Sequence, residues 1–172
     1  ERFGDIHVEE RLHDGEELQP GDSLARISGS LRSILSAERT MLNFIQRLSG
    51  VDTLTQKYVQ AVQGLPVQVL DTRKTLPGWR RLDKYAVRAG GGHNHRMGLY
   101  DAILIKDNHL AGMKGDVVRA IEKARTFAAS SQLSIEIEVD TLEQLDRVLS
   151  TRPNMVLLDN MPLEVLRKAV QR

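Results

Sequence analysis

A short apolar run that ends in charged residues occurs four times along the chain. The runs are Val67–Leu70 before Asp71 to Lys74, Ala102–Ile105 before Lys106, Leu133–Ile137 before Glu138, and Met155–Leu158 before Asp159. Helical patterns separate them, and alternation of strands with helices predicts parallel strands joined by right-handed crossovers. The carboxyl ends of parallel strands share one edge of a sheet, where ligands bind. The repeat therefore predicts an α/β fold with a charged site at that edge.

Helical periodicity covers much of the remaining chain. Apolar residues recur at three-and-four spacing from Leu31 to Leu48, and the stripe resumes from Val51 to Val62 after an expected interruption at Ser49-Gly50. Further helices are expected at 79–89 with Leu82, Tyr85 and Ala86 on the buried side, from Asp116 to 128 with Val117, Ile121 and Ala124 inward, from Thr141 with Leu142, Leu145, Val148 and Leu149 buried, and from Pro162 to 170. Short strands are expected at 6–8 and 24–29.

The number of strands leaves the architecture open. Four strand-helix units make about half of a closed (β/α) barrel, which needs close to eight strands to fill its interior. An open, doubly wound sheet normally carries a glycine-rich first turn, and none of the four runs is followed by one.

Composition excludes several classes of protein. The 24 basic and 23 acidic residues give a net charge of +1, so the global field favours no nucleic-acid partner. The absence of cysteine excludes disulfides and thiolate chemistry. The apolar runs are too short to span a membrane. These features predict a soluble, cytoplasmic protein without a membrane partner.

Two loops carry cations suited to binding anions. Arg73-Lys74 places a guanidinium beside an ammonium directly after a predicted strand, which suits carboxylates or phosphates, although a solvated loop would look the same. The stretch from Gly90 to Arg96 is compatible with a phosphate cradle, a metal site of His93 and His95, or an anion-binding loop using His95 and Arg96. The glycine spacing does not match a P-loop, and two histidines are weak evidence for metal.

Three charges follow the later strands. Lys106 at the end of a buried strand needs an anion as compensation, so it is a candidate Schiff-base lysine, a phosphate ligand or a structural partner of Glu138 and Asp159. The two carboxylates could hold a divalent cation, bind sugar hydroxyls or stabilise positive charge. Glu136 shares the strand face of Glu138, so the pattern does not decide which carboxylate meets a ligand.

Seven motifs, in order along nearly the whole chain, together resemble the quinolinate phosphoribosyltransferase family. They are Glu38-Arg39-Thr40, Leu42-Asn43-Phe44, Leu48-Ser49-Gly50, Asp71-Thr72-Arg73-Lys74-Thr75-Leu76-Pro77-Gly78, Asn94-His95-Arg96-Met97-Gly98-Leu99, Ile105-Lys106-Asp107-Asn108-His109 and Leu158-Asp159-Asn160. The resemblance implies the end of an α/β sandwich domain over residues 1–42 and part of an incomplete, seven-stranded TIM-like α/β barrel over 43–172. It also implies conversion of quinolinate and phosphoribosyl pyrophosphate, with Mg²⁺, to nicotinate mononucleotide, pyrophosphate and CO₂ in NAD synthesis.

The resemblance also implies residue roles. Thr72, Arg73, Lys74, His95 and Arg96 are expected to bind quinolinate, and Arg39 to reach the partner's site in a homodimer or higher oligomer. Lys106, Glu138 and Asp159 are expected to face phosphoribosyl pyrophosphate, with Lys74 joining these three as catalytic residues and the two carboxylates as weak or indirect metal ligands. Periodicity alone would make Arg39 an ordinary exposed residue.

Relative to the family, the chain is expected to lack parts of both domains, and 172 residues alone are expected to be inactive. The competing functions are a nicotinate phosphoribosyltransferase or the molybdenum-associated relative on the same scaffold, a non-catalytic anion-binding or assembly module, and a Schiff-base aldolase using Lys106. The number of cations favours a dicarboxylate substrate.

Overall fold

The structure is a computed structural model that describes residues 5–172, so the predicted start of the first domain at residue 1 lies outside the described residues. The chain divides into two compact units, one up to His95 and one from Arg96 onward. Each unit is described by itself.

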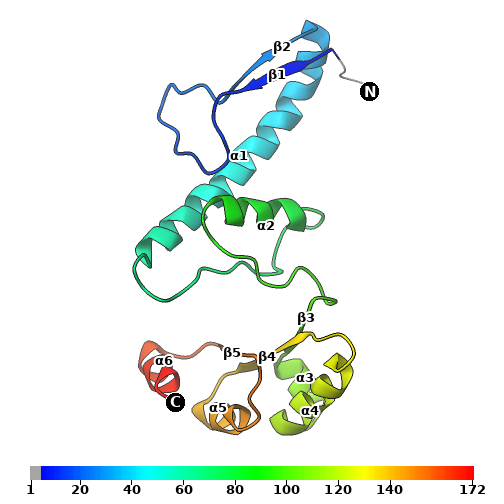
Figure 1. Cartoon of the computed structure of the whole chain (residues 1–172), viewed down its shortest axis with the longest axis vertical. Helices are drawn as coiled ribbons and strands as arrows, with labels where there is room; N and C mark the ends of the chain where they lie inside the picture. Colours follow the sequence, from blue (N-terminus) through cyan, green and yellow to red (C-terminus); the bar gives the residue numbers. More distant parts are fainter. Residues whose placement is uncertain (1–4) are drawn as a thin grey trace. The chain divides into compact units, whose positions relative to one another are not determined.

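The first unit combines a hairpin with two helices (Figure 1). Strand β1 (His7–Glu10) pairs antiparallel with β2 (Ala25–Ser28), which confirms the two predicted short strands. Helix α1 (Leu31–Ala61) begins at Ser30, whose side chain accepts a hydrogen bond from Ser33 N. Helix α2 (Arg80–Ala89) packs against α1. Stacking of Phe44 on Trp79, with ring centroids 4.7 Å apart, adds an aromatic contact to this unit.

Helix α1 is continuous, so the predicted interruption at Ser49-Gly50 is wrong. One glycine inside a helix costs about 1 kcal/mol relative to alanine, which the rest of a 31-residue helix outweighs. The apolar periodicity correctly predicted a helix here, but several of its apolar side chains are exposed: Leu31 is 70% exposed and Leu35 61%.

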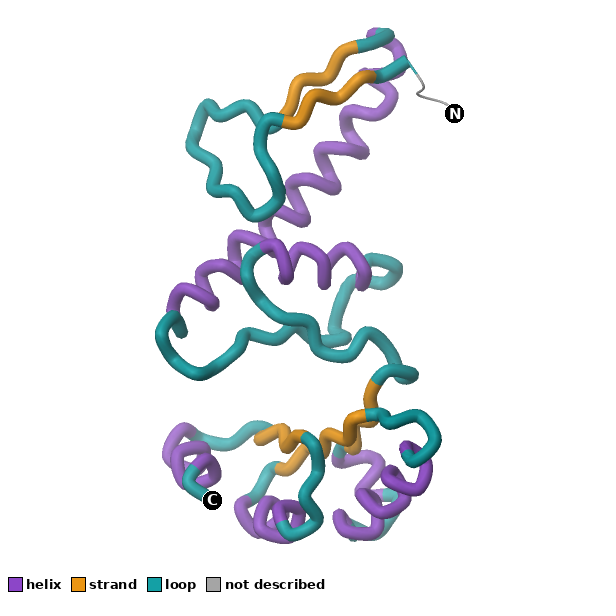
Figure 2. Tube along the Cα trace, viewed as in Figure 1, coloured by secondary structure: helices purple, strands orange, loops and turns teal. Residues whose placement is uncertain are grey.

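The predicted strand at 67–70 is also wrong as a regular strand. Only Leu70 has a bridge partner, His93, through the bonds His93 N to Val69 O (2.8 Å) and Asp71 N to His93 O (3.1 Å). A strand requires a continuous ladder, and within the described residues this segment pairs at one position only. Figure 2 shows it as loop. The bridge nevertheless joins the loop that carries Arg73 to the loop that carries His95.

The second unit is a parallel sheet covered on one face by helices (Figures 1 and 2). Strands β3 (Ala102–Ile105), β4 (Ser134–Val139) and β5 (Met155–Leu158) lie in chain order, as the repeat predicts. The helices are α3 (Asp107–Ala111), α4 (Val117–Ala128), α5 (Leu142–Leu149) and α6 (Leu163–Val170). The apolar core combines residues of the strands with inward residues of the helices, such as Ile137, Ile121 and Val148, which are fully buried.

Side-chain caps start two of these helices at the predicted residues. Asp116 accepts from Arg119 N (3.1 Å) and Thr141 from Gln144 N (3.2 Å). Helix α3 was not predicted; it begins directly after Lys106, whose N–H donates to His109 Nδ1 (2.9 Å). Every helix within residues 5–172 is too short or too polar to span a bilayer.

Candidate functional site

The charges predicted at the strand ends of the second unit lie at one edge of the sheet. The register pairs Ile105 with Ile137, and Val139 with Leu158, so Lys106, Glu138 and Asp159 all stand at the carboxyl ends of neighbouring strands. Lys106 Nζ lies 2.9 Å from Glu138 Oε2. The Lys106 side chain is 42% exposed and that of Glu138 13%, so the ammonium remains open to a ligand while the carboxylate is largely enclosed.

The contact between Lys106 and Glu138 is an ion pair rather than a well-directed hydrogen bond, since Glu138 Oε2 is buried and forms no hydrogen bond of good geometry with any residue from 5 to 172. This ion pair distinguishes the two glutamates, which the sequence pattern left equivalent. Glu138 meets Lys106, whereas Glu136 lies earlier on the same face and is 7% exposed.

Asp159 is held beside the end of β4. Its N–H donates to Val139 O (2.9 Å), and its carboxylate accepts from Asn160 Nδ2 (2.6 Å). Within residues 5–172, no group of three or more histidine and carboxylate side chains is placed to hold a metal ion. Glu138 and Asp159 are compatible with Mg²⁺ that also binds phosphate oxygens, because Mg²⁺ keeps several waters and needs only one or two carboxylates.

The loop after Leu70 presents the second predicted group of cations. Thr72 Oγ1 accepts from Lys74 N (3.0 Å), which tightens the loop, and Lys74 is exposed. The carbonyl of Arg73 accepts from an Arg80 guanidinium nitrogen (3.3 Å). Arg73 Nε is buried and has no hydrogen-bond partner among the described residues. A buried donor without a partner costs free energy, so Arg73 suits an incoming carboxylate or phosphate.

The glycine run serves packing rather than phosphate binding. A Cβ on Gly90 would lie 2.5 Å from Asp52 O, and one on Gly92 would lie 2.8 Å from both Thr55 Cγ2 and Val87 Cγ1. The run therefore lets the end of α2 approach α1 closely. This corrects the predicted option of a phosphate cradle and leaves His95 and Arg96 as the binding candidates of this stretch.

The buried side of α2 differs in part from the prediction. Ala86 is buried as predicted, at 2% exposed, but two charged residues that periodicity missed are buried with it. Leu82 and Tyr85 are 37% and 53% exposed, whereas Asp83 and Lys84 are 7% and 1% exposed. Lys84 forms an ion pair with Asp71, and Arg47 forms one with Asp83 at 3.1 Å. Hydrophobic periodicity cannot predict a buried ion pair. The sequence features that could have indicated this one are Asp71, directly after an apolar run, and Lys84, inside a predicted helix.

Arg96 and Arg39 complete the predicted set. An Arg96 guanidinium nitrogen donates to Ala102 O (3.1 Å), at the start of β3. Arg39 is exposed on α1 and forms no ion pair within the part of the chain that the structure describes. The structure therefore brings Lys106, Glu138 and Asp159 together, and it joins the loops of Arg73 and His95.

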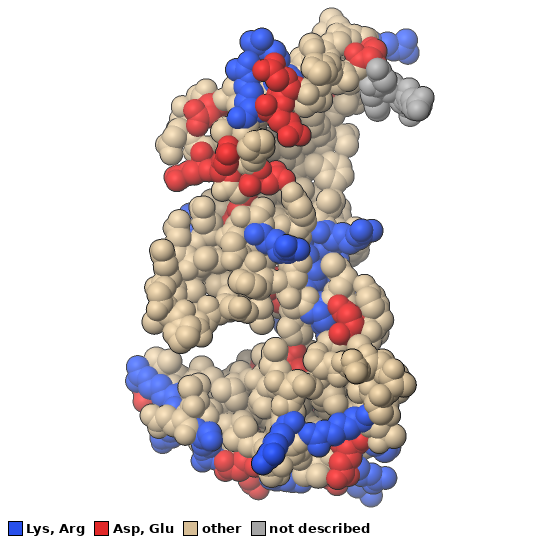
Figure 3. All heavy atoms as spheres, viewed as in Figure 1, with Lys and Arg blue, Asp and Glu red and all other residues tan. Residues whose placement is uncertain are grey.

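A groove of about 1250 Å³ in the first unit has the wrong charge for an anion. Residues of the hairpin, its loop, α1 and α2 line it, and the stretch from His7 to Leu24 holds six acids and one arginine. Acidic side chains gather over the hairpin and its loop in Figure 3. Burial, then the charge of Asp14, raises the pKa of Asp52, and the hydrogen bond to Asp14 raises the pKa of Tyr85.

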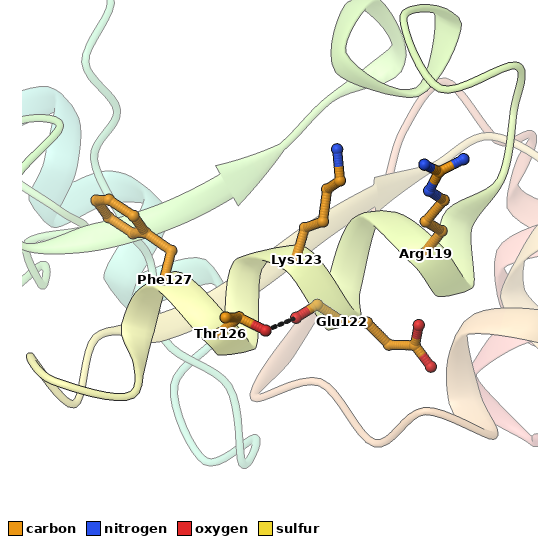
Figure 4. A pocket seen from close by; sticks show the side chains of 5 residues that line it. All are labelled: Arg119, Glu122, Lys123, Thr126 and Phe127. Carbon is orange, nitrogen blue, oxygen red and sulfur yellow. Dashed lines mark hydrogen bonds between the residues drawn. The ribbon is translucent and has the colours of Figure 1, made fainter.

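A second hollow, of about 580 Å³, lies on the outer side of α4. It is lined by Arg119, Glu122, Lys123, Thr126 and Phe127 (Figure 4). The bond drawn there, Thr126 Oγ1 to Glu122 O (3.0 Å), belongs to the helix itself. Phe127 is 72% exposed and the charged side chains do not converge, so the strand ends remain the better candidate site.

Comparison with known proteins identifies one family. The family model "Quinolinate phosphoribosyl transferase, C-terminal domain" matches residues 51–172, and the N-terminal domain model matches residues 1–49. Nicotinate-nucleotide pyrophosphorylase [carboxylating] of Mycobacterium leprae is 51% identical over 162 residues, covering 94% of this chain and 56% of that protein. The Bacillus subtilis protein named "Probable nicotinate-nucleotide pyrophosphorylase [carboxylating]" is 46% identical over 165 residues, covering 95% of this chain and 56% of that protein.

Solved structures give the same answer. NadC from Streptococcus pyogenes matches with a TM-score of 0.91 at 41% identity, over 99% of this chain and 60% of that one. The nicotinate-nucleotide pyrophosphorylase from Francisella tularensis matches with a TM-score of 0.89 at 40% identity, over 98% of this chain and 58% of that one. The chain thus spans a little over half the length of these relatives. Both domain models and these identities establish that the chain belongs to the quinolinate phosphoribosyl transferase family.

Proposed function

We propose that the protein carrying this chain transfers a phosphoribosyl group from phosphoribosyl pyrophosphate to quinolinate, giving nicotinate mononucleotide, pyrophosphate and CO₂. The observation that carries the proposal is the placing of Lys106, Glu138 and Asp159 at the carboxyl ends of three neighbouring parallel strands, in a chain of this family. The relatives from Mycobacterium leprae and Bacillus subtilis bear names for this carboxylating reaction.

The anion-binding roles follow from charge. Quinolinate is a dianion, so we assign its carboxylates to Arg73, His95 and Arg96, with Thr72 and Lys74 nearby. The buried Nε of Arg73 supports this assignment, because a carboxylate would supply the acceptor that this donor lacks. Arg39 would add a further cation across a homodimer interface, or within a larger oligomer, where its exposed position on α1 leaves it available.

The strand-end residues suit the transfer step. The pyridine nitrogen attacks the ribose carbon while the bond from that carbon to pyrophosphate breaks, so positive charge builds on the sugar. Glu138 and Asp159 would stabilise this charge, and Lys106 and Lys74 would neutralise the departing pyrophosphate. Bound Mg²⁺, with Glu138 or Asp159 as weak or indirect ligands, would supply further neutralisation of the leaving phosphates. The carboxylate beside the ring nitrogen then leaves as CO₂, and a proton replaces it.

The arrangement of the second unit supports the predicted barrel. Its strands follow one another in chain order with helices on one face, whereas a doubly wound sheet carries helices on both. We therefore propose that β3 to β5 are part of an incomplete TIM-like barrel wall, following the end of a sandwich domain. The boundary between residues 42 and 43 and the cytoplasmic location stay predictions from the sequence.

The test is an assay of the full-length protein with carboxyl-labelled quinolinate, phosphoribosyl pyrophosphate and Mg²⁺. We expect labelled CO₂ and pyrophosphate in equal amounts, and no pyrophosphate when nicotinate replaces quinolinate. Pyrophosphate release with nicotinate would identify a nicotinate phosphoribosyltransferase instead. Binding of phosphoribosyl pyrophosphate without turnover of either acid would identify a non-catalytic anion-binding module.

A further inference from the structure

Helix α2 contains a lysine that the proposed reaction does not use. Lys84 is 1% exposed, as deeply buried as the core residues of the second unit. Lysine is almost never fully buried unless it is paired, because its ammonium loses hydration. The partners of Lys84 therefore indicate what the residue is for.

Lys84 and its partners form a cluster of four residues, Asp71, Lys84, Asn94 and His95, called here the Lys84 cluster. Lys84 Nζ contacts Asp71 Oδ1 and donates to His95 O (2.8 Å). The same Asp71 oxygen accepts from His95 N (2.8 Å). With the Asn94 amide oriented to suit its neighbours, its nitrogen donates to Asp71 Oδ2 (2.8 Å) and Lys84 O (2.9 Å).

The cluster joins the two loops of the first unit that carry the proposed quinolinate ligands. Asp71 directly precedes Thr72, Arg73 and Lys74, while His95 is itself a proposed ligand and directly precedes Arg96. One turn earlier on α2, Arg80 binds the next part of the first loop, through Arg73 O and Thr75 Oγ1 (both 3.3 Å). Both loops are thus fastened to one helix within a few residues of the cations.

The energetics argue for a role beyond stability. The side chains of Lys84 and Asp71 are 1% and 6% exposed, so both charges are desolvated. Apolar residues of similar volume often replace a buried ion pair with no loss of stability, whereas hydrogen bonds in several directions fix geometry. A methionine at position 84 would fill the space but would not fix the distance between Asp71 and the backbone of His95.

We propose that Lys84 is a positioning residue for the quinolinate site: through Asp71 and the backbone of His95, it holds the Arg73 loop and the His95 loop at the spacing that a dicarboxylate requires. The inference rests on the proposed function. It concerns quinolinate more than phosphoribosyl pyrophosphate, because Arg73, His95 and Arg96 lie in or beside the Lys84 cluster. Of the residues assigned to phosphoribosyl pyrophosphate, only Lys74 lies near the cluster, and Lys106, Glu138 and Asp159 lie outside it.

The test uses the double variant Lys84→Met with Asp71→Asn in the full-length protein, which removes both charges together and leaves no buried charge unpaired. We expect kcat/KM for quinolinate to fall about 100-fold, since misplacement by about 1 Å can cost that much, while KM for phosphoribosyl pyrophosphate stays within about threefold. The matched control is Arg88→Met, one turn further on α2 and exposed, which should change neither.

A second variant, Asn94→Ala, removes the amide bonds and leaves the ion pair, so it tests the idea even if the double variant fails to fold. We expect a smaller change in the same direction, about tenfold for quinolinate, with the melting temperature within about 4 °C of the wild type. Equal rises in KM for both substrates, or full activity of a folded variant, would overturn the positioning role. Wild-type protein that neither binds quinolinate in calorimetry nor releases CO₂ would instead overturn the proposed function itself.

Discussion

Substitution of Lys106 by methionine separates catalytic from structural use of the charge at the end of β3. The ammonium lies 2.9 Å from Glu138 Oε2 but is 42% exposed, so water screens the pair and its contribution to folding is small. Removing the 42% exposed Lys106 side chain would open the Glu138 carboxylate, now 13% exposed, to solvent that can take the place of the ammonium. We therefore expect a loss of about 1 kcal/mol in the free energy of unfolding, or about 2–4 °C in Tm.

The expected effect on activity is larger. If Lys106 neutralises charge on the departing pyrophosphate, its loss should lower kcat about 100- to 1000-fold, the usual cost of removing one preorganised group that stabilises transition-state charge. The assay is release of pyrophosphate and labelled CO₂ by the full-length protein at saturating quinolinate and phosphoribosyl pyrophosphate. Thermal unfolding of the same preparation measures stability.

The double variant Lys106→Met with Glu138→Gln tests whether the loss of stability and the loss of activity have separate causes. Neutral glutamine no longer needs the ammonium, so we expect the double variant to recover the lost Tm without recovering activity. Retention of activity within about threefold in Lys106→Met would refute a catalytic role, since so small a change is below the cost of a transition-state contact. A fall in Tm of more than about 10 °C would refute the claim that the pair is energetically minor.

Three further predictions concern stability and assembly. Ile121→Ala, at a fully buried position on α4, should cost about 2–5 kcal/mol in chemical denaturation, whereas Phe127→Ala, at a 72% exposed position on the same helix, should cost less than about 0.5 kcal/mol. Burial raises the pKa of Asp52 above its ordinary 3.8, so the contribution of Asp52 to the free energy of unfolding falls as the pH rises through that raised pKa. Asp52→Asn should therefore stabilise the protein at neutral pH and flatten the acidic part of the curve of stability against pH. A curve that matches the wild type would contradict this. If Arg39 serves the partner's site, mixing inactive Arg39→Ala and Lys106→Met proteins should restore about 25% of wild-type activity, because half of randomly formed dimers are mixed and each holds one intact site.

The strand-end charges were predictable because their pattern is local. Four residues of apolar strand followed by a charge place Lys106 and Asp159 at the sheet edge because each strand has a neighbour to pair with. The pairing of Lys106 with Glu138, rather than with Glu136, was not predictable, because both glutamates lie on one face and only the register with β3 distinguishes them.

The errors concern residues whose environment is set by distant contacts. Val67–Leu70 has strand composition, yet within the described residues only His93 lies beside it, and composition cannot supply a missing neighbour. The run Gly90-Gly91-Gly92 was open to a phosphate-binding interpretation because the sequence does not show that α1 packs against it. Likewise, Ser49-Gly50 looked like a break because propensity is a weak prior against the cooperativity of a long helix.

Lys84 shows why residues that position a site, without binding the ligand themselves, are not found from the sequence. Periodicity assumes that the buried face of a helix is apolar, so on α2 it selected Ala86, which is buried, together with Leu82 and Tyr85, which are exposed. Beside Ala86 the buried face carries Asp83 and Lys84, whose partners come from α1 and from the loop at Asp71. A helix that turns charges inward holds other segments in place by directed bonds, which an apolar face does not. On α2, the buried charges beside the cationic loop are what the proposed positioning role of Lys84 requires.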